Sequence, residues 1–313
     1  MAEPEIWTVR GLLDLVSQID EQMTDRSFAF VLGAGASKQS GIPTGAELVN
    51  SWLGELYRRH EPPQSGRSLE EWATAENLGI TGFDHKSAAT FYPYVFERRF
   101  RADPEQGYAY LESLMESKEP SFGYSVLAQI LCKTRHSVVI TTNFDDLVAD
   151  ALLMYTGKHL LVCGHEQLTG FVRPHMRRPL LAKIHRDLLL EPKNSPEGTK
   201  TIAPEWDRAL RALFQHYTPL VMGYGGNDGS LLGFLRELRP GSIGGGLLWC
   251  YWLPEGEPRT EIKEVVARHN GALIGIDGFD ELMLQVNERF SFELLTNEID
   301  TSQTENRDVS KII

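Results

Sequence analysis

The feature that most constrains the fold is a glycine-rich turn within residues 28–43, in the run FAFVLGAGASKQSGIP. The apolar stretch 28–32 is followed by Gly33 and Gly35. This order is typical of a buried strand that leads into a tight turn at the start of a helix. Such a turn brings backbone N–H groups close to phosphates, whose charge the helix N-terminus favours. It indicates a dinucleotide site. An ordinary strand–helix turn is the alternative, since Lys38 replaces the third glycine of the full signature.

Short apolar runs bounded by polar residues recur along the chain and predict further buried strands. With the first at 27–32, they lie at 137–141, 159–163, 180–184, 218–223, 247–253 and 272–276. Helical spacing of apolar residues predicts helices at 6–23, 44–60, 145–155, 204–217, 231–238, 260–270 and 278–290, with Thr260 as a cap. Strands that alternate with helices pair in parallel and carry helices on both faces. We therefore predict an α/β fold, a Rossmann-like doubly wound parallel sheet.

Residues 67–135 have a mostly helical pattern and predict a helical insertion between the first and second predicted strands. Within it, the run FYPYVFERRF at 91–100 is either a lid or subunit contact, or the packed core of the insertion, as aromatic residues at such spacing usually are. We predict one domain over 1–292. The polar residues 293–313 then form a tail or linker.

Composition excludes several classes of function. The formal charge of −12 argues against direct nucleic-acid binding by this domain. The three cysteines are far apart, so we expect no zinc site, and they suit a reducing cytoplasm. No apolar segment is long enough to cross a membrane, and the first residues lack the pattern of a signal peptide.

Polar and glycine-rich segments follow four of the predicted strands. They are 33–37, 141–145, 183–187 and 223–228. Each has an ordinary explanation as a helix cap, a turn or a satisfied histidine. Because ligands bind at the carboxyl ends of parallel strands, however, all four segments are expected to meet at one edge of the sheet. The sequence therefore predicts a single site there.

The motifs GAGAS with SGIP, TTNFDDL, KIHRD and GYGGND stand in an order that resembles the Sir2 family. The resemblance is to its zinc-free, SIR2-like NADase effectors in bacterial antiphage defence. It implies NAD+ as substrate, no metal, and catalytic roles for Asn143 and His185. The NAD-binding residues that it implies are Gly33, Ala34, Gly35, Ala36, Ser37, Ile42, Pro43, Thr142, Asp145, Gly223, Tyr224 and Asp228. Among these, Gly33 to Ser37 would contact the pyrophosphate, Asp145 the nicotinamide-ribose pocket, and Gly223 and Asp228 the adenosine end.

The residue types suit cleavage of the nicotinamide–ribose bond, which passes through an oxocarbenium-like state. The amide of Asn143 can hold water and ribose hydroxyls, because it both donates and accepts hydrogen bonds. A histidine can take a proton from water or from a ribose hydroxyl near neutral pH, which suits His185.

Three departures from the deacylase branch of the family predict hydrolysis rather than deacylation. The paired zinc cysteines are missing. Thr44-Gly45-Ala46 replaces an Asp-Phe-Arg-like stretch after SGIP. Arg186 replaces a glycine beside His185 and should narrow the peptide channel. The same arginine could displace His185, or contact a phosphate or another subunit.

We therefore predict a cytoplasmic NAD+ hydrolase that depletes NAD+ in antiviral, abortive-infection defence. It would act as a homo-oligomer or with a fused or associated sensor protein. The alternatives are a module that senses NAD or ADP-ribose without turnover, and an NAD-dependent protein deacylase.

Overall fold

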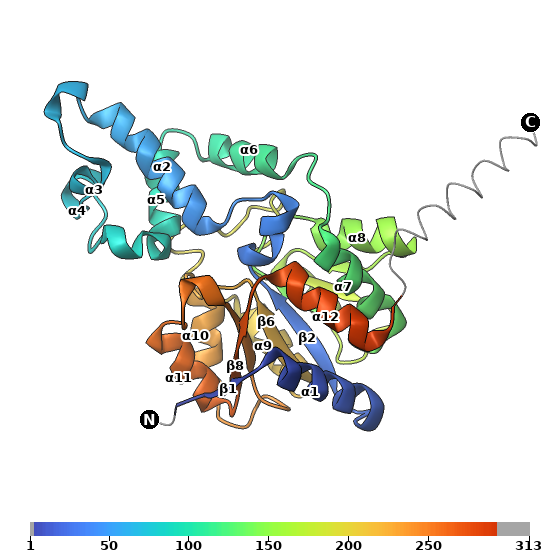
Figure 1. Ribbon diagram of the computed structural model, residues 1–313. Coiled ribbons are helices and arrows are strands. Elements are labelled where there is room, and N and C mark those ends of the chain that lie inside the picture. Colours follow the sequence, from blue (N-terminus) through green and yellow to red (C-terminus); the bar gives the residue numbers. More distant parts are fainter. Residues whose placement is uncertain (1–2, 293–313) are drawn as a thin grey trace, which may run out of the picture.

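One sheet of eight strands, every pair of them parallel, is the centre of the part of the chain that the computed structural model describes, residues 3–292 (Figure 1). The strand order is β1-β8-β7-β6-β2-β3-β5-β4. The bounds are β1 Glu5–Trp7, β2 Ser27–Leu32, β3 Val138–Thr141, β4 Leu161–Cys163, β5 Leu180–Lys183, β6 Tyr217–Met222, β7 Leu248–Trp252 and β8 Ala272–Ile276. The chain leaves β2 toward β3 and returns to β6 on the other side. The strand order therefore reverses at β2, where open sheets of this kind bind ligands.

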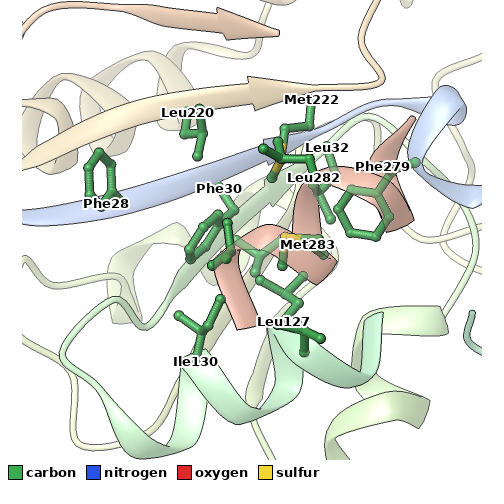
Figure 2. Packing of buried hydrophobic residues seen from close by; sticks show 14 of the residues in the cluster. Phe28, Phe30, Leu32, Leu127, Ile130, Leu220, Met222, Phe279, Leu282 and Met283 are labelled. Atoms are coloured by element: carbon green, nitrogen blue, oxygen red, sulfur yellow. The ribbon is translucent and has the colours of Figure 1, made fainter. Parts of the chain in front are cut away.

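Alternate residues of β2 serve the two faces of the sheet, as the period of a strand dictates. Phe28, Phe30 and Leu32 pack against one helical layer, and Figure 2 shows them with residues of α7 and α12. That layer consists of α1 Val9–Gln22, α7 Phe122–Lys133, α8 Leu147–Thr156 and α12 Phe279–Phe290. Ala29 and Val31 face the other layer, which is α9 Pro204–Phe214, α10 Gly229–Glu237 and α11 Thr260–Arg268. The doubly wound parallel sheet is confirmed.

The predicted strands are all present within a residue or two, but three local predictions are wrong. Tyr217, expected in the helix over 204–217, begins β6, and α9 ends at Phe214. The helix expected over 6–23 begins at Val9, because residues 5–7 form β1 and pair with β8. This strand has three residues at the sheet edge, too few for a recognisable alternation. Thr260 does not cap its helix either. It is the first helical residue, and the cap position is Arg259.

A separate helical lobe stands above the sheet in Figure 1. It contains α2 Gly45–His60, α3 Leu69–Trp72, α4 Ala75–Leu78, α5 Tyr92–Arg99 and α6 Pro104–Met115. The buried Trp52 is its centre, with the rings of Tyr92, Phe96 and Phe100 at centroid distances of 5.2, 5.6 and 5.8 Å. Apart from the exposed Tyr94, the aromatic residues of 91–100 thus pack in the core of the lobe, which Leu188 of the loop after β5 also joins.

The packing bears on where this insertion begins and ends. The apolar side chains of α2 belong to the core of the lobe, whereas those of α7 pack in the main core beside the sheet. We therefore propose an insertion that includes α2 and leaves out α7, in place of the boundaries 67–135. The predicted tail or linker at 293–313 lies outside the described residues. No helix within residues 3–292 is long and apolar enough to span a membrane.

Candidate functional site

The four predicted segments follow the carboxyl ends of β2, β3, β5 and β6, and these strands are consecutive in the sheet. Their loops therefore meet at one edge, as expected. After β2 the chain enters a 3₁₀ helix, Ala34–Ser40, and reaches α2 only at Gly45. The remaining 3₁₀ turns are Pro63–Ser65, His85–Phe91, Glu166–Phe171 and Leu253–Glu255.

The glycines of the first segment allow two loops to touch. The N–H groups of Gly33 and Gly35 donate to the carbonyl oxygens of Met222 and Gly223, at 3.0 and 2.9 Å. A Cβ atom on Gly33 would lie 2.5 Å from Cα of Tyr224, and one on Gly35 2.8 Å from Cα of Gly223. No side chain fits at such distances. These glycines join the β2 and β6 loops, and their N–H groups are engaged within the protein.

The hydroxyl of Ser37 is the centre of a buried hydrogen-bond network. It donates to Oδ2 of Asp145 at 2.7 Å, which uses its single hydrogen. It must therefore accept from the other two contacts, Nδ2 of Asn143 at 3.1 Å and the hydroxyl of Tyr124 at 2.8 Å. Among the described residues, none donates to Oδ1 of Asn143. The network fixes the Asn143 amide and leaves this oxygen for another donor.

Burial raises the pKa of Asp145 above its ordinary value, although the hydrogen bonds from Ser37 and from the Leu147 N–H act in the opposite direction. Tyr124 lies in α7, and desolvation raises the pKa of its hydroxyl far above the ordinary value, so it stays a donor at neutral pH. Nothing in the local sequence marked Tyr124. Its place beside Ser37 follows from how α7 packs on the sheet.

Lys183 joins the loop after β3 to the loop after β5. Its side chain is fully buried, and Nζ contacts the Phe144 carbonyl at 3.0 Å. The carboxylates of Asp146 and Asp187 lie 2.6 and 2.8 Å from the same atom. Burial alone would lower the pKa of Lys183, but these two carboxylates raise it above the ordinary value. This lysine belongs to the KIHRD motif, and nothing in the sequence indicated its partners.

His185 is buried at the end of β5 and contacts the start of α10. Its Nε2 lies 2.7 Å from Oγ of Ser230, and that hydroxyl donates to Asp228 at 2.6 Å. Because the serine hydrogen goes to the carboxylate, Nε2 of His185 carries a hydrogen and donates it. Burial lowers the pKa of His185, so the ring is neutral at pH 7 with its lone pair on Nδ1. Such a ring can accept a proton.

The side chain of Asp228 serves His185 and caps α10, accepting from the N–H groups of Ser230 and Leu231 at 3.1 and 3.2 Å. Tyr224 points into the core, with its ring 5.6 Å from that of Trp249. Ala36 is fully buried, while Ala34, Ile42, Pro43 and Thr142 are half-buried. Within residues 3–292, no hydrogen bond or ion pair connects the Ser37 network to His185. Asn143 and His185 are thus held independently.

Arg186 adopts a left-handed backbone conformation with φ of +67°, which favours glycine. Its guanidinium binds both carboxylate oxygens of Glu166, at 2.9 and 2.7 Å, and also reaches the Glu191 carboxylate at 3.3 Å. The paired arginine lowers the pKa of Glu166 to about 2. Arg186 therefore ties two loops together, and the hydrogen bond of His185 is intact beside it.

Comparison with known proteins identifies part of this chain. Residues 137–267 match a protein-family model described as a SIR2-like domain. This segment, which is less than half of the chain, is similar to a SIR2-like domain. The matched segment includes Asn143, His185 and Asp228, whereas Ser37 and Tyr124 lie before it. No curated protein matches the chain significantly.

Solved structures similar to the chain include a Sir2 bound to an acetylated peptide, with 14% identity, 90% of this chain and 98% of the other covered, and a TM-score of 0.45. Sir2Tm bound to a propionylated peptide has 13% identity, the same coverage and a TM-score of 0.44. A mutant Sir2 homologue in complex with ADP-ribose has 15% identity, again with this coverage, and a TM-score of 0.39.

Residues 3–292 contain no cluster of three or more histidine, cysteine or acidic side chains that could hold a metal ion. All three cysteines are free thiols. Burial raises the pKa of the Cys163 and Cys250 thiols to about 12, which leaves them protonated.

Proposed function

We propose that this SIR2-like domain hydrolyses NAD+ to ADP-ribose and nicotinamide. The observation that carries the proposal is the pairing, at one sheet edge, of a neutral histidine that can accept a proton with a fixed amide whose oxygen is open. Both groups lie beside the point where the strand order reverses, the usual place for a nucleotide in such sheets. The match to the SIR2-like family adds support.

Each group has a defined part in the proposed reaction. Water adds to the anomeric carbon of the ribose as the bond to nicotinamide breaks, and the electron pair of that bond leaves with neutral nicotinamide. Oδ1 of Asn143 accepts a hydrogen bond from the attacking water and orients it. Nδ1 of His185 takes the proton that the water loses, directly or through a ribose hydroxyl. NAD+ and water thus give ADP-ribose, nicotinamide and one proton, which His185 then releases to solvent.

The packing of the loops refines the expected contacts with NAD+. Since the N–H groups of Gly33 and Gly35 are engaged with the β6 loop, we propose that the pyrophosphate contacts the exposed side of the turn around Ala34. Asp228 would act through His185 rather than at the adenosine end, because its carboxylate bonds the serine that accepts from the imidazole. Gly223 and Tyr224 would shape the loop from within.

An Arg186 that displaced His185 would favour the alternative of a sensor without turnover. It contacts carboxylates and leaves the His185 hydrogen bond intact, which favours the hydrolase. In line with the resemblance to antiphage effectors, we further propose that the reaction depletes NAD+ in infected cells, in an oligomer or with a sensor protein.

The test is nicotinamide release from NAD+, measured over a range of protein concentrations. His185→Ala and Asn143→Ala should each reduce the rate by about 10²–10⁴-fold. The exposed His60→Ala and Asn50→Ala in α2 are matched controls and should keep the rate. NAD+ that binds without release at any concentration would favour a sensor, and release only with an acyl-lysine peptide would favour a deacylase.

The pH profile gives an independent check on His185. Because burial lowers its pKa below the ordinary 6.5, the base stays unprotonated as the pH falls through 6.5. The rate should therefore hold at that pH and decline only at lower values. A rate already halved near pH 6.5 would contradict the buried, neutral imidazole.

A further inference from the structure

A cleft opens at the opposite edge of the sheet from the candidate site. It has a volume of about 580 Å³, and Ser27, Ser137, Pro179 and Tyr217 line it. These residues begin or immediately precede β2, β3, β5 and β6, so the cleft lies at the amino ends of the same strands. A parallel strand of six residues such as β2 is about 20 Å long. The cleft is therefore separate from the proposed NAD+ site.

The lining of this cleft is basic in a chain whose formal charge is −12. Besides Arg135, its basic side chains are Lys158, His159, His175, Arg177, Arg178 and His216. Among the described residues of the lining, Asp25 is the one acidic side chain. Such a concentration of positive charge in a concave surface attracts anions.

One of these cations, Arg135, has a structural role at a helix end, whereas the adjacent Arg177 and Arg178 have none. Arg135 donates to the carbonyls of Ile19, Asp20 and Met23 at the end of α1, which is how a cation satisfies a helix C-terminus. Arg177 and Arg178 lie in the loop before β5 and are exposed. Neither guanidinium has an ion pair or a hydrogen bond with the rest of residues 3–292. They are free to bind a ligand.

We propose that this cleft binds a phosphorylated small molecule of nucleotide size, with Arg177 and Arg178 on its phosphates. A guanidinium matches two phosphate oxygens at once, and neighbouring arginines suit a diphosphate. The volume is that of a small-molecule pocket and exceeds what a single phosphate needs. Met176, Pro179 and the rings of His175 and His216, 5.7 Å apart, offer surface to the rest of the ligand.

The test is titration calorimetry of the full chain at constant ionic strength, with sodium pyrophosphate, ATP and AMP as probes and sulfate as the reference anion. Arg177→Glu/Arg178→Glu should weaken binding of pyrophosphate and ATP by about tenfold or more, since it replaces the attraction by repulsion. The control Arg58→Glu/Arg101→Glu changes the charge equally at two exposed arginines of the helical lobe and should keep the affinity. Circular dichroism establishes that each variant is folded.

Three results would overturn the proposal. Equal weakening in both double variants would show general attraction to positive charge. Binding that NAD+ displaces and that Arg177→Glu/Arg178→Glu leaves unchanged would place the phosphate at the carboxyl edge. Binding of a single-stranded oligonucleotide with none of the small phosphates would make the cleft a nucleic-acid surface. Because nicotinamide release is not the readout, the result does not depend on the proposed hydrolase.

Discussion

The two edges of the sheet use polar residues in different ways. At the carboxyl edge, Lys183 is fully buried and has three oxygen partners, and the Ser37 hydroxyl has three polar contacts. At the amino edge, Arg177 and Arg178 are exposed. The first arrangement positions loops around a site, and the second leaves charges free for a ligand. Substitution of Lys183 at the carboxyl edge should therefore cost much stability, and substitution of Arg177 or Arg178 at the amino edge little.

The largest effect is expected from Lys183→Met. The change leaves two carboxylates and the Phe144 carbonyl without their buried partner. Breaking a fully buried ion pair costs about 3–5 kcal/mol, and because the Asp146 carboxylate is exposed we expect a loss near the lower value, about 3 kcal/mol. Urea unfolding measures the loss. Lys158→Met, at an exposed lysine of the amino edge, should change the free energy of unfolding by less than about 0.5 kcal/mol. Similar losses in both variants would erase the contrast between the edges.

Glu166→Gln should have the next largest effect, and that effect depends on pH. The ion pair with Arg186 lowers the pKa of Glu166 from 4.5 to about 2. The contribution of this pair to the free energy of unfolding is therefore complete above about pH 4.5 and is lost as the pH falls toward 2. The free energy of unfolding of the variant should be about 2 kcal/mol lower than that of the unmodified protein at pH 7, and almost the same at about pH 2. Urea unfolding at both pH values tests this. The control is Glu257→Gln, which removes one partner of an exposed ion pair with Lys263 and should leave the free energy of unfolding unchanged at both pH values.

Tyr124→Phe tests the Ser37 network with a smaller change. The ring keeps its packing, but the hydroxyl that donates to Ser37 is lost, which should cost about 1 kcal/mol. The control Tyr94→Phe deletes the hydroxyl of an exposed tyrosine of α5, and it should leave the free energy of unfolding measurably unchanged. An equal stability of the two variants would mean that Tyr124 does not hold Ser37.

The smallest effect is expected from Arg177→Ala/Arg178→Ala. Neither side chain has a partner to lose within residues 3–292, so the free energy of unfolding should change by less than about 0.5 kcal/mol. Removal of like charges from one cleft could only add stability. A loss of about 2 kcal/mol in urea unfolding would show that the arginines support the fold, and the two edges would then be alike.

Much of the architecture followed from the sequence because its signals are local. Apolar runs such as 180–184 and the helical spacing of 44–60 depend on near neighbours, and strands that mostly alternate with helices imply parallel pairing. That implication alone brought the loops that contain Asn143 and His185 to one edge. The three-residue strand β1 was not predicted because its partner, β8, is more than 260 residues away in the sequence.

Periodicity and chain order fix the α/β class, the succession of strands and the edge at which the site lies, so these follow from the sequence alone. Which side chains meet at that edge depends on how the folded chain packs. Tyr124 reaches Ser37 and Ser230 reaches His185 across 87 and 45 residues of chain. The same holds for the role of Arg186, whose partner Glu166 is 20 residues earlier. Hydrogen bonds and ion pairs are set by distances of about 3 Å, and no local pattern in a sequence encodes distances between remote segments.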